Sequence, residues 1–379
     1  MAKFFAHGPE GLVDVVYKEL QELELNPIEK TPGGVVFDTD WRGCYKANLW
    51  LRSATRVGMP IISFKAKTAE ILYQEIRKFD FTQFVSNQQT IMVDALVKKS
   101  EVFRDQRFAA LKIKDAIVDQ FRDKFGERPN VEKENPDLRI LARILEEDVQ
   151  ISIDTSGEPL FMRGYRREMT EAPLKENLAA GLVLLTKWDQ KTNIIDPMCG
   201  SGTFLIEAAL MAARIAPGLL RRGFAFQKYL NFSAADWNEL VNEASEAERE
   251  TDVKFFGFDR DSKAISISES NAKRAGVSDF IHFERKDSRD FEPPKEMGSE
   301  KGVIMVNPPY GERLGNFEQL KDVYRDLGFV LKSKFKNWDI WVLSGHAGLT
   351  NGLSLKSSEN FNVHNGPIEC RWLKFHVNK

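Results

Sequence analysis

The sequence predicts an α/β protein whose second half is a doubly wound, mainly parallel sheet and whose first half is an α+β region. In the second half, short apolar runs typical of buried strands alternate with helical patterns, as they do when helices cover both faces of a parallel sheet. In the first half, strands and helices follow one another in the order of a small ferredoxin-like unit. Each element follows from its own pattern.

The first 64 residues have the order strand, helix, strand, helix, strand. Leu12, Val16 and Leu20 recur at helical spacing, and the turn Pro32-Gly33-Gly34 leads into a second apolar strand. The elements expected here are a strand at 3–6, a helix at 9–23, a strand at 35–37, a helix at 40–51 and an extended segment at 58–63.

Residues 65–158 form a second small lobe. Apolar residues alternate with polar ones along three strands, and a helix between them ends near Gly126. The strands are expected at 91–97, 140–144 and 149–153, and the helix at 110–126. Because Ser156-Gly157-Glu158-Pro159 is a turn, we expect domains at 1–64, 65–158 and 159–379.

The second half continues the alternation to its end. Strands are expected at 193–195, 253–258, 280–283, 303–306, 339–343 and 370–377. Helices are expected at 173–188, 203–216, 261–275 and 317–335. The segment 217–251 interrupts this order, and we interpret it as an insertion that carries a polar surface helix at 233–250.

A glycine loop follows the strand at 193–195 and precedes an apolar helix. Its residues are Asp196, Pro197, Met198, Cys199, Gly200, Ser201, Gly202 and Thr203. The glycines let the backbone approach a ligand, and the helix behind them offers unpaired N–H groups. The loop lacks the Lys of a phosphate loop and begins with an acid, so it favours a cationic ligand over a pyrophosphate.

A second motif, Asn307-Pro308-Pro309-Tyr310, stands at the carboxyl end of the strand 303–306, where open α/β sheets bind ligands. The prolines hold the backbone in a set direction, so Asn307 and Pro308 offer fixed carbonyl acceptors and Tyr310 offers a flat face. This arrangement suits a planar ring that carries an exocyclic amine.

Together the two motifs resemble the class I S-adenosylmethionine-dependent methyltransferases that modify exocyclic amines of bases. The resemblance implies a Rossmann-like domain in which Asp196–Thr203 cradles the methionine moiety and Asn307–Tyr310 receives the target base. It also implies further cofactor contacts, namely Asp259 at the ribose, Asp287 and Ser288 near the adenine, and Arg260 and Asn177.

The flanking segments narrow the resemblance. Gly311-Glu312-Arg313-Leu314, Arg163-Gly164-Tyr165-Arg166 and the segment 172–180 look like the 23S ribosomal RNA guanine-N2 methyltransferase family with a THUMP region, over essentially the whole chain. In some members a second methyltransferase follows, but this chain ends at Lys379, so we expect the guanine-N2 activity alone, with RNA held by the THUMP core. Arg163, Tyr165 and Arg166 contact RNA or form structural ion pairs.

Composition limits the partners. A net charge of −2 and a pI near 6.3 disfavour nucleic-acid binding by the whole surface, but 51–78 and 98–114 each contain six basic residues. No apolar run approaches a membrane span and the amino terminus lacks a signal peptide, so we expect a cytoplasmic protein. The three Cys and five His residues are scattered, which predicts no metal and no disulfide. The oligomeric state stays open.

Three alternatives to the ribosomal RNA enzyme are a transfer RNA guanine-N2 methyltransferase, a DNA adenine-N6 methyltransferase and a non-catalytic RNA-binding protein. Asn307 and the segment 311–314 favour the ribosomal enzyme, and a DNA enzyme would leave the THUMP-like half unexplained. Intact motifs count against the non-catalytic protein. Cys199 could be a nucleophile, but a packing role is favoured because no partner base stands in the motif.

Overall fold

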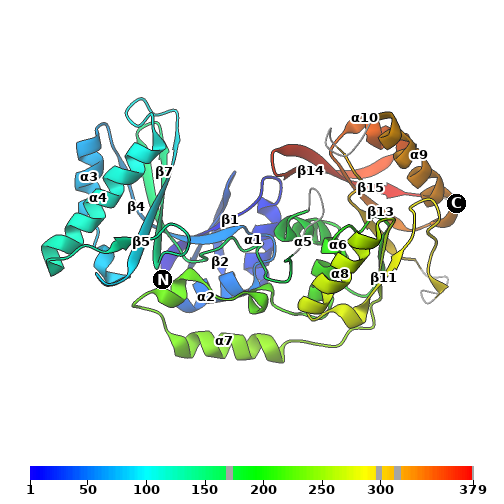
Figure 1. Cartoon of the computed structure of the whole chain (residues 1–379), viewed down its shortest axis with the longest axis horizontal. Coiled ribbons are helices and arrows are strands. Elements are labelled where there is room, and N and C mark those ends of the chain that lie inside the picture. Colours follow the sequence, from blue (N-terminus) through cyan, green and yellow to red (C-terminus); the bar gives the residue numbers. More distant parts are fainter. Residues whose placement is uncertain (168–173, 296–300, 311–316, 378–379) are drawn as a thin grey trace.

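The computed structural model describes residues 1–167, 174–295, 301–310 and 317–377. It has two sheets side by side, an amino-terminal one and a carboxyl-terminal one (Figure 1). None of the helices in the described ranges is long and apolar enough to cross a membrane.

The amino-terminal sheet is continuous through both expected lobes. Its strand order is β2-β3-β1-β4-β8-β7-β5-β6. The strands are β1 (Ala2–His7), β2 (Asn26–Thr31), β3 (Gly34–Thr39), β4 (Arg56–Lys65), β5 (Thr90–Lys98), β6 (Asn130–Val131), β7 (Leu138–Leu145) and β8 (Asp148–Asp154). Because β4 pairs with β1 on one side and β8 on the other, the proposed division at residue 64 separates two parts of one sheet.

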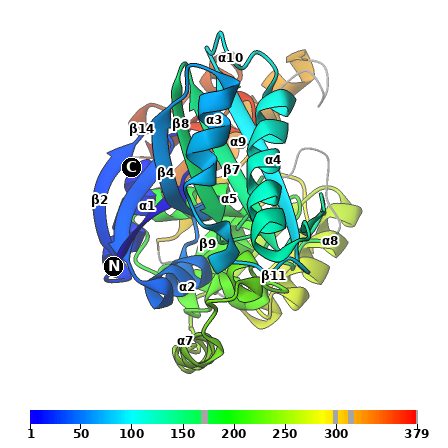
Figure 2. The same ribbon diagram turned by 90° about the vertical axis from the view of Figure 1, so that its left-hand side faces the viewer.

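Four helices cover this sheet. They are α1 (Val13–Glu22), α2 (Trp41–Trp50), α3 (Ala69–Arg77) and α4 (Gln106–Phe125). Figure 2 shows α3 and α4 side by side over one face. Local signals set the ends: Asp40 accepts a hydrogen bond from the Gly43 N–H at 2.8 Å and begins α2, and Gly126, with a φ of 77°, ends α4 where the sequence predicted.

The carboxyl-terminal sheet has the order β11-β10-β9-β12-β13-β15-β14. Its strands are β9 (Ile194–Asp196), β10 (Phe255–Asp259), β11 (Ile281–Arg285), β12 (Val303–Val306), β13 (Asp339–Ser344), β14 (Ser357–Asn365) and β15 (Ile368–His376). The pairs from β11 to β13 are parallel, whereas β15 is antiparallel to β13 and β14. This confirms the predicted mainly parallel sheet.

The helices of this half are α5 (Glu176–Leu185), α6 (Thr203–Ala212), α7 (Ala234–Glu246), α8 (Ser262–Arg274), α9 (Phe317–Lys334) and α10 (Ala347–Thr350). Several ends differ from the expected ones: the helix expected at 203–216 stops at Ala212, and the start of the helix expected at 173–188 lies partly outside the described residues. The strands β2, β6 and β14 were not predicted. All three are edge strands, and β2 and β14 consist mostly of polar residues with few buried side chains, so they have no apolar pattern to detect.

Buried charges join the two halves. Arg163, expected either at RNA or in an ion pair, is buried and donates to the carbonyl oxygens of Leu160 and Arg52. Its Nε lies 3.7 Å from Oε1 of Glu207 on α6, which also accepts a hydrogen bond from the Tyr165 hydroxyl at 3.0 Å. Arg163 and Tyr165 are therefore structural residues, because burial keeps both from an RNA surface.

The segment 217–251 has a different role from the predicted surface insertion. Its aromatic residues belong to the core of the amino-terminal half, where Phe226 stacks on Tyr45 with ring centroids 4.4 Å apart. The Leu230 N–H donates to the Phe84 carbonyl, and α7 contacts α2, below which it lies in Figure 1. The segment therefore completes a core to which the sequence before residue 158 contributes most of the residues.

This contact predicts that the amino-terminal half depends on residues far along the chain. Phe226→Ala should lower the free energy of unfolding by about 3–5 kcal/mol, because it removes a fully buried ring. The matched control is Phe329→Ala, which removes a ring that is 70% exposed and should change stability by less than about 0.5 kcal/mol. Urea denaturation of the full chain measures both, and equal effects would contradict the shared core.

Candidate active site

The carboxyl ends of four neighbouring parallel strands meet at one edge of the second sheet. A cavity of about 1010 Å³ lies there. Apart from Gly202 and Asn177, the residues predicted to bind cofactor or substrate all line it: Asp196, Pro197, Met198, Cys199, Gly200, Ser201, Thr203, Asp259, Arg260, Asp287, Ser288, Asn307, Pro308, Pro309 and Tyr310. The two motifs predicted from the sequence therefore face one space.

The glycine loop has the expected strand, turn and helix around it. Gly200 and Gly202 have φ values of 54° and 77°, a backbone region that favours glycine, and α6 begins directly afterwards at Thr203. A β-carbon at Gly202 would lie 3.0 Å from the Phe283 ring, so this glycine packs the loop against β11 and does not line the cavity. The absence of a side chain at Gly202 therefore lets the backbone approach the Phe283 ring and not a ligand.

Asp196 carries a buried carboxyl group into this cavity. It is 2% exposed, its Oδ1 accepts a hydrogen bond from the Met198 N–H at 3.1 Å, and no ion pair to it occurs among the described residues. Burial, together with the nearby Asp259, raises the pKa of this carboxyl group well above its usual value. A cationic group bound beside Asp196 would lower that pKa again, so the site favours a positively charged ligand.

Asp259 links the loops that follow two adjacent strands. Its Oδ2 accepts a hydrogen bond from the Gly200 N–H at 3.0 Å, and its Oδ1 accepts one from the Asp261 N–H at 2.9 Å. An ionised carboxylate has about four acceptor positions, so these two bonds leave room for ligand hydroxyl groups. Asp259 therefore shapes the glycine loop as well as facing the cavity.

Asp287 stands after β11 and is held by Arg289. The Nε and Nη2 of Arg289 lie 2.9 and 3.0 Å from its two carboxylate oxygens, and these hydrogen bonds lower the pKa of Asp287. Asp287 therefore stays ionised in a fixed orientation, beside Ser288 at the cavity wall.

Asn307 is the most distinctive group of the second motif. Its side-chain Oδ1 is buried and has no hydrogen-bond partner among the residues that the structure describes. Leaving a buried acceptor unpaired costs roughly 1–3 kcal/mol. Other buried side-chain atoms, such as Asn177 Oδ1, also lack a partner, but among the described residues with such an atom Asn307 is the one that lines the cavity. The following segment Gly311-Glu312-Arg313-Leu314 lies outside the described residues.

Tyr310 is held more tightly than the sequence indicated. Its hydroxyl accepts a hydrogen bond from Asn365 Nδ2 at 2.8 Å, and a β-carbon at Gly345 would collide with its ring. Only 8% of the residue is exposed, and burial raises the pKa of the hydroxyl group. The ring is therefore fixed between Gly345 and the cavity.

Three other residues considered from the sequence, Asn177, Arg166 and Cys199, interact with other parts of the protein. Asn177 is absent from the cavity wall, and its Nδ2 donates to the Ser53 carbonyl at 3.2 Å, across the junction between the two halves. Arg166 donates to Thr203 Oγ1 at 2.6 Å and so supports the glycine loop from behind. Burial raises the pKa of the Cys199 thiol well above its usual value, so this group stays protonated and packs instead of acting as a nucleophile.

Part of the cavity wall was not predicted from the sequence. One face of α9 contributes Gln319, Asp322, Val323 and Asp326, and the β14–β15 hairpin contributes Asn365 and Ile368. The spacing of the α9 residues identifies one helix face, but the sequence does not say what that face meets. The hairpin had no signal because β14 itself was missed.

A family profile described as "RMKL-like, methyltransferase domain" matches residues 163–374, more than half of the chain. The chain belongs to this family. Before that region, profiles described as "RlmL ferredoxin-like domain" and "THUMP domain" match residues 3–58 and 66–154. The family membership confirms the predicted methyltransferase and the predicted fold class.

Relatives within this group match over the whole chain. A putative RNA methyltransferase of Synechocystis is 38% identical over 375 residues, which cover 99% of this chain and 96% of the relative. A ribosomal RNA large subunit methyltransferase K/L of Syntrophotalea carbinolica is 37% identical over 383 residues, and the chain spans about half its length (53%). The crystal structure of a putative methyltransferase complexed with SAH is 30% identical, with a TM-score of 0.90, over 100% of this chain and 98% of that one.

The raised pKa of Asp196 predicts a pH-dependent stability difference. A carboxyl group whose pKa is higher in the folded than in the unfolded protein stabilises the fold below its unfolded pKa and loses that contribution as pH rises through the folded pKa. Asp196→Asn keeps an acceptor for the Met198 N–H but cannot ionise. Without cofactor, its stability relative to the original protein should therefore increase as pH rises above about 4.

Urea unfolding across a series of pH values measures this difference. Asp189→Asn is the control, because Asp189 is exposed and its hydrogen bonds with Thr192 and Lys191 lower its pKa. The stability of Asp189→Asn relative to the original protein should therefore decrease as pH rises. A stability difference for Asp196→Asn that does not vary with pH would show that this carboxyl group is not destabilised by burial.

Proposed function

We propose that this protein transfers a methyl group from S-adenosyl-L-methionine to the exocyclic N2 amine of a guanine in large-subunit ribosomal RNA, with S-adenosyl-L-homocysteine as product. The observation that carries the proposal is the unpartnered, buried Oδ1 of Asn307. It shares a cavity with the buried carboxyl group of Asp196. Asn307 Oδ1 can accept a hydrogen bond from a ligand, and the Asp196 carboxyl group can bind a cationic one.

The cavity residues fit the cofactor. Asp196, without an ion pair among the described residues, matches the methionine amine, and the free acceptor positions of Asp259 match the ribose hydroxyl groups. Asp287 and Ser288 would contact the adenine end, and Arg260 lines the same cavity. When bound, S-adenosylmethionine supplies a methyl group on a positively charged sulfur. The loop Asp196–Thr203 would hold the methionine end of the cofactor.

Asn307 and Pro308 would orient the target amine. The lone pair of a guanine N2 amine is delocalised into the ring, so the amine is a weak nucleophile. Acceptance of its two hydrogens by Asn307 Oδ1 and the Pro308 carbonyl turns that lone pair toward the methyl group, a gain made mainly in the transition state. The Asn307 amide is neutral and is not a strong base. The proton released after transfer therefore goes to solvent.

Tyr310 would stack on the target base once the base has left its helix, as enzymes that act on bases require. Gly345 lies against the Tyr310 ring, and Asn365 holds its hydroxyl group. Because the ring is already fixed in place, little side-chain entropy is lost when a base stacks on it. Asn365 is accordingly a positioning residue.

RNA would be held by the amino-terminal half, with the domains divided as 1–64, 65–158 and 159–379. The two basic segments, 51–78 and 98–114, differ in how well they suit this role. In segment 51–78, Arg52 is buried and Arg56 forms an ion pair with the buried Asp154, so neither faces RNA. Segment 98–114 contains four basic residues with no ion pair among the described residues, namely Lys98, Lys99, Arg104 and Lys112. Phosphate contacts are therefore expected chiefly from residues 98–114.

The alternatives share the same cavity and differ in substrate. An activity assay distinguishes them. The purified protein is incubated with labelled S-adenosylmethionine and, in parallel reactions, with large-subunit ribosomal RNA, transfer RNA or duplex DNA. The proposal expects N2-methylguanosine in the ribosomal RNA, identified by mass spectrometry of the digested nucleosides. Label found mainly in transfer RNA, or on adenine in DNA, would show that the substrate is that nucleic acid and not ribosomal RNA. If cofactor binds but none of the nucleic acids is labelled, a non-catalytic RNA-binding protein is favoured.

Removing the Asn307 acceptor should affect the rate more than binding. Asn307→Ala is expected to lower the single-turnover rate by roughly 10²-fold or more and to leave cofactor affinity nearly unchanged, because the lost contact acts in the transition state. Asn242→Ala, an exposed substitution on α7, is the matched control and should have no effect. RNA with inosine in place of the target guanine lacks the N2 amine, and its methylation at an equal rate would exclude the guanine-N2 assignment.

The Tyr310–Asn365 hydrogen bond should behave as one unit. Tyr310→Phe and Asn365→Ala each remove it and should lower the single-turnover rate by roughly two- to tenfold, the effect of one neutral hydrogen bond. The double variant should be no slower than the slower single variant. Tyr310→Ala should be slower than either, because it also removes the stacking ring. Additive effects of the two single substitutions would show that Asn365 does not act through Tyr310.

A further inference from the structure

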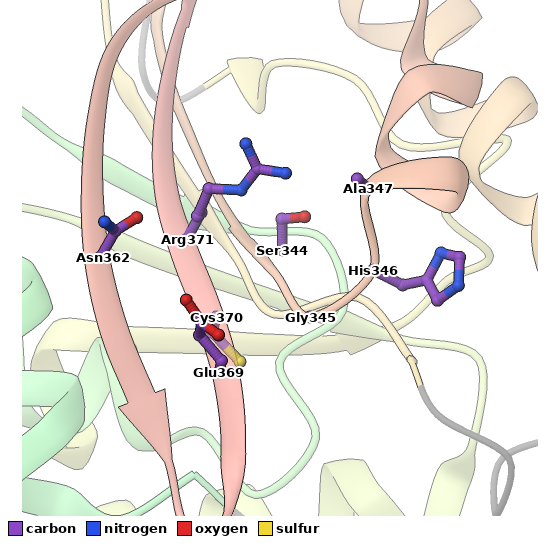
Figure 3. Close-up of a pocket in the computed structure, with 8 residues that line it drawn as sticks. All are labelled: Ser344, Gly345, His346, Ala347, Asn362, Glu369, Cys370 and Arg371. Carbon is purple, nitrogen blue, oxygen red and sulfur yellow. The ribbon is translucent and has the colours of Figure 1, made fainter.

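A second cavity lies beside the catalytic one, across the tip of the β14–β15 hairpin. Its volume is about 380 Å³, and its wall comes from residues 344–347, which end β13 and follow it, and from the hairpin (Figure 3). None of the residues predicted to bind the cofactor or the target base lines it. It therefore has no role in the reaction described so far.

The two cavities share a thin wall. Asn365 and Ile368 line the catalytic cavity, whereas Glu369 and Cys370, which follow directly in sequence, line the second one. Cys370 Sγ lies 3.7 Å from the Tyr310 hydroxyl, and Gly345, which lines the second cavity, packs against the Tyr310 ring. The second cavity is therefore adjacent to Tyr310, where the target base would stack.

The second cavity contains polar groups without protein partners. No hydrogen bond or ion pair occurs for the side chains of Arg371, Glu369 and Asn362 among the described residues, and all three are exposed. Arg371 and Glu369 lie two positions apart on β15 and so project from the same face, and Asn362 is opposite Arg371 in the hairpin. Figure 3 shows the Arg371 guanidinium near Ser344, with the His346 ring directed away from it.

These charges narrow the class of ligand. Glu369 would repel an isolated phosphate, and Arg371 would repel a metal ion; the described residues also contain no group of three His, Cys, Asp or Glu side chains that could hold a metal. A neutral ring with donors and acceptors on separate edges satisfies both charges. Guanine has this pattern, because its O6 and N7 accept from an arginine fork while its N1–H and N2 amine donate to a carboxylate.

We propose that this cavity binds the base of a guanine next to the target nucleotide, with Arg371 donating to O6 and N7 and Glu369 accepting from N1–H and the N2 amine. The proposal rests on the proposed function, since it concerns the same RNA strand. Unpaired bases in single-stranded RNA are commonly read on these edges. Arg371 and Glu369 are thus specificity residues, separate from the groups that carry out methyl transfer.

Equilibrium binding tests the pocket without requiring turnover. The full chain, saturated with S-adenosylhomocysteine, is titrated with short fluorescent single-stranded RNAs in which the nucleotide on either side of one central guanine is varied in turn. The original protein should bind RNA with a flanking guanine roughly tenfold more tightly than RNA with a flanking adenine, the discrimination of one good base-edge contact. Arg371→Gln and Glu369→Gln should each reduce this ratio to less than about threefold.

The control is Lys336→Gln, which removes an exposed positive charge before β13, at the opposite edge of the sheet. It should leave the guanine-to-adenine ratio unchanged. A ratio near one in the original protein, or a ratio that survives both pocket substitutions, would overturn the proposal. The inosine test at the target position judges the proposed function separately, because it reads methyl transfer and not the flanking base.

Discussion

The parallel pairing of β9 with β10 on one side and β12 on the other is the constraint on which the candidate active site depends. Ile194 is in register with both Phe255 and Val303, so the three strands run side by side and end at the same edge. Asp196, Asp259 and Asn307 are far apart in sequence, yet each directly ends or follows one of these strands. Their convergence is a consequence of strand direction and not of any local signal.

The same edge contains groups that do not stabilise the fold. Burial raises the pKa of Asp196, and Asn307 Oδ1 has no partner among the described residues, so both are better satisfied by ligands than by protein. Glu207 and Arg163 in the junction form an ion pair and hydrogen bonds with other groups, although Arg163 Nε and Glu207 Oε2 also have no hydrogen-bond partner among the described residues. Asp196 and Asn307 differ from that pair because they line the cavity.

The two halves are joined as one body by more than a linker. Arg221, in the segment 217–251, donates to the carbonyl oxygens of Pro159, Met162 and Glu158, which lie between the two sheets. Phe226 and Tyr229 of the same segment lie in the amino-terminal core. This segment therefore connects the half that contains the basic residues at 98–114 to the half that contains the candidate active site.

The sequence by itself determined the fold class, the positions of the glycine loop and the Asn307 motif, and most strands of the second sheet, because strand and helix periods and glycine turns are local signals. It did not determine β14, the role of segment 217–251 or the structural positions of Asn177 and Arg163. Those depend on which surfaces meet: the edge strand β14 is held by backbone hydrogen bonds to β15, and Phe226 is buried in a core that includes Tyr45 of the amino-terminal half. Such long-range contacts leave no periodic pattern in the residues that make them, so only the tertiary structure decided them.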